Sequence, residues 1–102
     1  MEKYKVVISQ EALDMLKEHL AFLADVSKDA ATKTKDSIID SIKDLSSMPK
    51  KYPFFNESYI PQNKYHKMFV ETRYLVLYQI RDDAVFVDYI LDCRQDYSWL
   101  IK

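Results

Sequence analysis

Apolar residues recur at spacings of three and four in the first half of the chain, the spacing of one face of an α-helix. Two such stretches, residues 10–26 and 30–45, are separated by a polar break, and the second stops before Pro49. Ser9 and Asp29 precede the two stretches and are candidate N-caps. A β-branched run at residues 4–8 comes first. The pattern predicts a short strand followed by a helical hairpin.

The second half of the chain carries the period-two pattern of strands. Residues 66–72 alternate, residues 74–81 are almost wholly apolar, and residues 85–91 alternate again. A strand that is apolar on both sides is expected at the centre of a sheet. Strict alternation places Val85, Val87, Tyr89 and Leu91 on one face of the last strand. The connections are of hairpin length, so these strands are predicted to form an antiparallel meander.

Three prolines and several aromatic residues interrupt the pattern between residues 49 and 63, and we expect this loop to pack on the core. The fold class is therefore α+β, ordered β-α-α-β-β-β, with a helical hairpin on a small antiparallel sheet. A single domain should span residues 1–102. The chain has no glycine, so positive backbone φ angles should be rare or carried by Asn and Asp.

Composition narrows the environment and the chemistry. The net charge is −1, which gives no overall attraction for nucleic acid or an anionic membrane. No apolar run is long enough to span a bilayer, and the N-terminus does not resemble a signal peptide. A lone cysteine, Cys93, excludes an internal disulfide and fits a cytoplasmic protein. The two histidines lie far apart in the sequence, so no metal site is predicted.

Four segments resemble the RelE/ParE family of bacterial toxins in order and spacing. They are YKVVIS followed by Q-E-A (residues 4–12), L-x-x-MP-x-x-YP (residues 45–53), YLVLYQI-x-DD (residues 74–83) and RQDY (residues 94–97). The resemblance spans nearly the whole chain. It implies a toxin of a type II toxin–antitoxin, plasmid stabilisation-like module that inhibits growth until a co-expressed antitoxin neutralises it. No cofactor is implied.

The resemblance also implies where partners bind. An antitoxin of this family docks over the helical hairpin and sheet, so an apolar stripe on the first helix is the candidate antitoxin-binding surface. Its members are Met15, His19, Phe22, Leu23 and Val26. The alternative for His19 is simple packing on the core. For the toxin's target, the resemblance points to the C-terminal residues Arg94, Asp96, Tyr97 and Trp99.

The family contains two activities, inhibition of DNA gyrase without catalysis (ParE-like) and cleavage of mRNA on the ribosome (RelE-like). In the second case the protein is a metal-independent endoribonuclease, and the matching catalytic candidates are Arg94, Tyr97, His66 and Lys67. Such chemistry needs an acid, a base and cations around the scissile phosphate. His66 can instead be a strand-surface residue, and Arg94 a structural partner of Asp92 or Asp96.

Departures from the RNase pattern favour the gyrase activity. Leu75 stands where many RNase members have an arginine, and Asp92 stands where histidine is common. Each lost cation weakens binding to RNA. The sequence therefore favours a ParE-like inhibitor of DNA gyrase. A ribosome-dependent mRNA interferase, or a degenerate toxin that only binds its antitoxin, stays open as an alternative.

Overall fold

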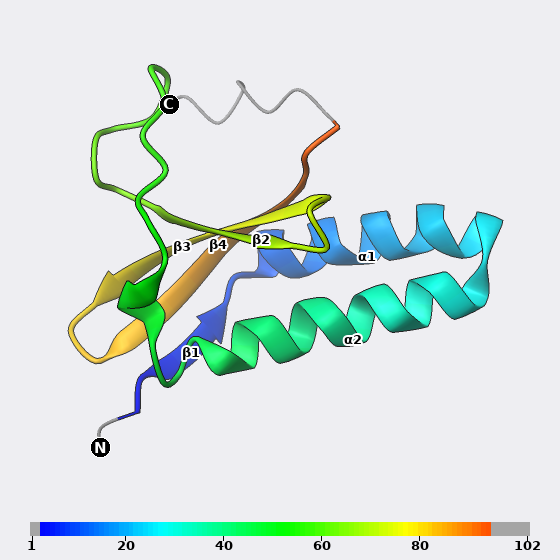
Figure 1. The fold of residues 1–102 in the computed structure, drawn as a ribbon, viewed down its shortest axis with the longest axis horizontal. Coiled ribbons are helices and arrows are strands. Elements are labelled where there is room, and N and C mark those ends of the chain that lie inside the picture. Colours follow the sequence, from blue (N-terminus) through cyan, green and yellow to red (C-terminus); the bar gives the residue numbers. More distant parts are fainter. Residues whose placement is uncertain (1–2, 95–102) are drawn as a thin grey trace.

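The computed structural model describes residues 3–94 and contains two long helices, four strands and one short 3-10 helix (Figure 1). In chain order the elements are β1 (Lys5–Ile8), α1 (Gln10–Val26), α2 (Lys28–Asp44), η1 (Pro49–Lys51), β2 (His66–Val70), β3 (Tyr74–Arg81) and β4 (Ala84–Asp92). The predicted order β-α-α-β-β-β is confirmed. Figure 1 shows the hairpin of α1 and α2 along one side of the sheet, with its turn projecting beyond the end of the strands.

The four strands form one sheet in the order β1-β4-β3-β2. The pairs β2–β3 and β3–β4 are antiparallel, as predicted for the meander. β1, however, pairs parallel with β4, so the sheet is mixed rather than wholly antiparallel. The length of a turn predicts pairing only between strands that follow one another in the chain. β1 and β4 are the first and last strands, so no turn joins them and the sequence pattern could not predict their pairing.

Serine hydroxyls begin both helices. Ser9 Oγ accepts a hydrogen bond from Ala12 N at 3.0 Å, which confirms the first predicted cap. Ser27 Oγ accepts from Ala30 N at 3.1 Å, so the second cap is Ser27 and the prediction of Asp29 is wrong. Asp29 lies one position inside the first turn of α2, where its negative charge interacts favourably with the helix dipole.

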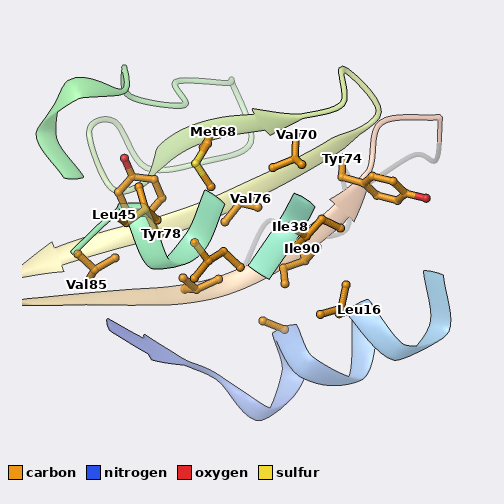
Figure 2. Close-up of a cluster of buried hydrophobic side chains, with 13 residues drawn as sticks. Leu16, Ile38, Leu45, Met68, Val70, Tyr74, Val76, Tyr78, Val85 and Ile90 are labelled. Atoms are coloured by element: carbon orange, nitrogen blue, oxygen red, sulfur yellow. The ribbon is translucent and has the colours of Figure 1, made fainter. Parts of the chain in front are cut away.

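The sheet is covered on both faces. The larger cluster packs β2, β3 and β4 against the helical hairpin (Figure 2), and Ile38, Met68 and Val76 are at most 1% exposed in it. On the opposite face, Leu75 and Leu77 pack against residues of the loop between η1 and β2. This arrangement confirms that β3 is buried on both sides and that the aromatic loop packs on the core.

A β-bulge changes the alternation of side chains in β4. Leu77 pairs with Tyr89 but Tyr78 pairs with Val87, so one extra residue enters β4 at this point. Val85 and Val87 consequently face the hairpin, whereas Tyr89 and Leu91 pack on the loop side. The prediction that these four side chains share a face is wrong, because strict period-two counting assumes a regular ladder.

The turn between β2 and β3 adopts positive φ angles without glycine. Glu71 and Thr72 both have φ of 55°. Asn63 and Asp82 also have positive φ, as expected, but positive φ at Glu and Thr was not predicted. A β-branched residue in this region is strained. The turn places Arg73 directly before β3.

Candidate functional site

The C-terminal end of β4 holds a cluster of three charged side chains, Arg73, Asp92 and Arg94, which we call the arginine cluster. Asp92 accepts hydrogen bonds from Arg94 N at 3.0 Å, Nε at 3.2 Å and Nη2 at 3.0 Å. Arg73 Nη2 lies 3.5 Å from Asp92 Oδ2. The side chain of Asp92 is 7% exposed and that of Arg94 is 59% exposed. Arg94 thus forms the ion pair with Asp92 that its structural alternative predicted, and its role in binding or catalysis stays a prediction.

Electrostatics keep Asp92 ionised. Burial alone would raise the pKa of its carboxyl, but the hydrogen bonds from Arg94 and the charges of Arg94 and Arg73 outweigh burial and lower it. The neighbouring Cys93 behaves in the opposite way, because burial and the charge of Asp92 raise the pKa of its thiol. A thiol held in its protonated form is a poor nucleophile.

Tyr74 lies beside the arginine cluster at the start of β3. Its ring is 5.1 Å from the Arg73 guanidinium carbon and 5.5 Å from the His19 ring, and burial raises the pKa of its hydroxyl. Figure 2 shows this side chain at the edge of the core, its hydroxyl pointing away from the other labelled residues. Within residues 3–94, the Tyr74 hydroxyl and Arg73 Nε are buried and have no hydrogen-bond partner.

A groove runs between α1 and the C-terminal half of β4, and we call it the α1–β4 groove. It consists of two adjoining cavities of about 520 and 320 Å³ that share Glu18 and His19. One end contains the arginine cluster and Phe22. The other end is lined by the remaining groove residues, Glu11, Asp14, Met15, Ile90 and Leu91. The groove therefore has carboxylates along its α1 wall, Glu18 and His19 where the two cavities meet, and the arginine cluster at one end.

The predicted antitoxin-binding residues of α1 differ in their surroundings. Phe22 and Val26 are 62% and 80% exposed. Met15 packs against the loop-side core. Leu23 is half-buried, and His19 Nε2 donates a hydrogen bond to Ile90 O at 2.8 Å. The exposed part of the stripe is therefore its C-terminal end, at Phe22 and Val26. His19 contacts the core, as the packing alternative predicted.

His66 and Lys67 lie away from Arg94. His66 pairs with Tyr78, whereas Asp92 pairs with Tyr74, four positions along β3. Four strand positions span about 13 Å. His66 Nδ1 donates to Tyr52 O at 2.8 Å, and its ring stacks 5.2 Å from Tyr78. The structure therefore does not bring His66 and Arg94 into one constellation, and Lys67 Nζ lies over the Phe55 ring instead.

Asp96, Tyr97 and Trp99 fall outside the described residues 3–94. Conversely, Arg73 and Tyr74 belong to the site although sequence reasoning did not select them, because only the turn and the register of β3 bring them beside Asp92. The one sequence feature that could have indicated them is that Arg73 stands immediately before the apolar run predicted to be a buried strand.

Two negative findings apply to the described part of the chain. No helix there is both long and apolar enough to cross a membrane. Residues 3–94 also contain no group of three or more His, Cys, Asp or Glu side chains arranged to hold a metal ion.

Two comparisons with known proteins, one of sequence and one of structure, both match this chain to proteins of toxin–antitoxin systems. A family model described as "ParE toxin of type II toxin-antitoxin system, parDE" matches residues 6–97. A solved structure of the "Chromosomal ParDE TA system from P. aeruginosa" has a similar fold, with a TM-score of 0.72 at 11% sequence identity, over 88% of this chain and 96% of that chain. No curated protein matches significantly. The chain belongs to the ParE family of toxins of type II toxin–antitoxin systems.

Proposed function

We propose that this ParE-family toxin inhibits DNA gyrase and is neutralised by an antitoxin docked along α1. Gyrase is favoured over mRNA as the target because the residues predicted to cleave RNA lie apart in the structure. Arg94 is bound to buried Asp92, while His66 lies about 13 Å away along the sheet and is engaged by Tyr52 and Tyr78. Acid–base cleavage of RNA needs such groups around one phosphate.

Purified toxin is expected to trap gyrase on DNA after strand cleavage. Incubation with gyrase, ATP and supercoiled plasmid, followed by denaturant and protease, should yield linear DNA in proportion to the toxin added. Gyrase without toxin provides the baseline. Unchanged supercoiling kinetics with no linear product would contradict the proposal.

The same preparation separates the remaining functions. An mRNA interferase would produce 2′,3′-cyclic phosphate ends on mRNA in programmed ribosomes, and we expect intact mRNA. A degenerate toxin would be inactive in both assays yet still bind its antitoxin. Each of the three functions thus gives a different pair of results.

The distal end of α1 is suited to the antitoxin because its apolar residues have no cover within the described chain. Phe22 and Val26 are four positions apart on α1, so both side chains lie on one face. At 62% and 80% exposed, they continue the α1–β4 groove beyond the end of the sheet. An amphipathic segment can bury this surface, with hydrophobic stabilisation of roughly 25 cal/mol per Å² of apolar area.

Replacing the two exposed residues should release the toxin from its antitoxin. The double variant Phe22→Ser, Val26→Ser is expected to keep its stability within about 1 kcal/mol, since exposed sites contribute little to folding. Co-expression with the reading frame adjacent to the toxin gene should rescue growth of cells carrying wild-type toxin but not the variant. Asp40→Ser, exposed on α2, is the matched control and should be rescued. Equal rescue of all three would exclude this surface.

A further inference from the structure

The arginine cluster has more hydrogen-bond donors than acceptors. Two guanidinium groups share the single carboxylate of Asp92. Arg94 uses Nε and Nη2 on Asp92, and its side chain is 59% exposed and lines the groove. The charges of the three side chains sum to +1, and the carboxylate of Glu18 on α1 lines the same cavity.

Two unpaired buried groups lie at the same place. Arg73 Nε and the Tyr74 hydroxyl are both buried without a partner in residues 3–94, and Tyr74 is 1% exposed. Buried donors are nearly always satisfied in proteins, so an adjacent pair of unpaired ones indicates a missing acceptor. A carboxylate would satisfy such donors through charge-assisted hydrogen bonds, and the net charge of +1 on the arginine cluster favours it.

Backbone geometry holds Arg73 in this position. Glu71 and Thr72 keep φ at 55° in the turn that precedes it, and Arg73 O accepts a hydrogen bond from Cys93 N at 2.7 Å. Strained turns persist where the surrounding structure fixes them, often beside binding sites. The guanidinium of Arg73 is therefore presented from a fixed backbone rather than from a free loop.

The rest of the groove selects the class of anion. Glu11, Asp14 and Glu18 lie along the α1 wall, and this row of carboxylates repels the repeated phosphates of a nucleic acid. Phe22, which is 62% exposed, provides apolar surface in the cavity of the cluster, and Met15 lines the adjoining cavity. A single carboxylate next to apolar side chains fits both features, and a protein segment supplies that combination.

We infer that the arginine cluster is a receptor for one carboxylate side chain of a bound protein segment, with Arg73 and Arg94 as its ligands and Asp92 as the positioning residue. The segment enters the α1–β4 groove with its acidic residue at the arginine cluster, apolar residues against Phe22 and Met15, and a basic residue near Glu11 and Asp14. This inference relies on the proposed function only for the identity of the segment as part of the antitoxin.

The test is a titration of the full chain with two capped peptides, followed by NMR of the arginine Nε–H groups. The peptides share the sequence Lys-Leu-Leu-Ala-Leu-X-Leu, with X either Glu or Gln. The Glu peptide should shift the Nε–H signals of Arg73 and Arg94 and bind about tenfold more tightly than the Gln peptide, the difference that a charge-assisted hydrogen bond provides. Arg94→Gln and Arg73→Gln should each reduce the difference, whereas Lys50→Gln, at the far end of the sheet, should preserve it.

Equal affinity for the two peptides, or no shift with either at millimolar concentration, would overturn the inference. So would a short DNA duplex that shifts the same signals more than the Glu peptide does, since this result identifies a phosphate site. If one of the two arginine variants folds poorly, the affinity difference measured with the other still tests the inference. The titration contains neither gyrase nor antitoxin, so its failure and the failure of the proposed function are distinguishable.

Discussion

Leu75→Arg is expected to unfold the protein. Leu75 is fully buried at the centre of the loop-side core, where Phe55 and Leu91 are also buried. An arginine there loses the hydrophobic stabilisation of the leucine, about 2 kcal/mol, and adds an unpaired buried charge that costs several kcal/mol more. The sum approaches the ~5–15 kcal/mol total stability of a typical domain. Circular dichroism should show no cooperative thermal transition.

Leu75→Met is the matched control, because it preserves volume and apolar character and should cost less than about 1.5 kcal/mol. A folded Leu75→Arg variant would show that the loop between η1 and β2 can move aside and admit the charge. The surface would then be able to present an arginine as RNase members do, and the variant's activity on ribosome-bound mRNA would need to be measured. The unfolded result would instead show that this chain is built around an apolar residue at that position.

Asp92→Asn is expected to destabilise the fold by about 2 kcal/mol, since it removes the negative charge and one of the two acceptor oxygens that Arg73 and Arg94 share, and leaves donors unpaired. The wild-type pKa of Asp92 is lowered in the folded state. Its contribution to stability is therefore complete above the unfolded pKa, about 3.9, and is lost as the pH falls through the folded value. Urea denaturation at several pH values measures both effects.

The free energy of unfolding of the wild type should fall below about pH 4, and the fall should be smaller in Asp92→Asn because one titrating group is gone. Asp40→Asn, on the exposed surface of α2, should keep the wild-type stability at neutral pH. If Asp92→Asn matched the wild type at every pH, the arginine cluster would make no net contribution to stability. Binding alone would then account for its geometry.

Local patterns were sufficient to predict most of the elements. The helical hairpin, its first cap at Ser9 and the buried central strand β3 follow from periods of 3.6 and 2, which depend only on neighbouring residues. The exposure of Phe22 and Val26 did not follow, because periodicity shows that a face is apolar but not how far the helix extends past the sheet.

The sequence alone determined that this chain has a hairpin and a meander, and its motifs indicated the toxin family. Only the tertiary structure decided that the sheet is mixed, that a bulge turns Tyr89 away from Val87, and that Arg73 and Arg94 meet at Asp92. These features depend on register and on contacts between residues far apart in the chain. Local preferences set which segments become strands, but long-range pairing sets which side chains share a site.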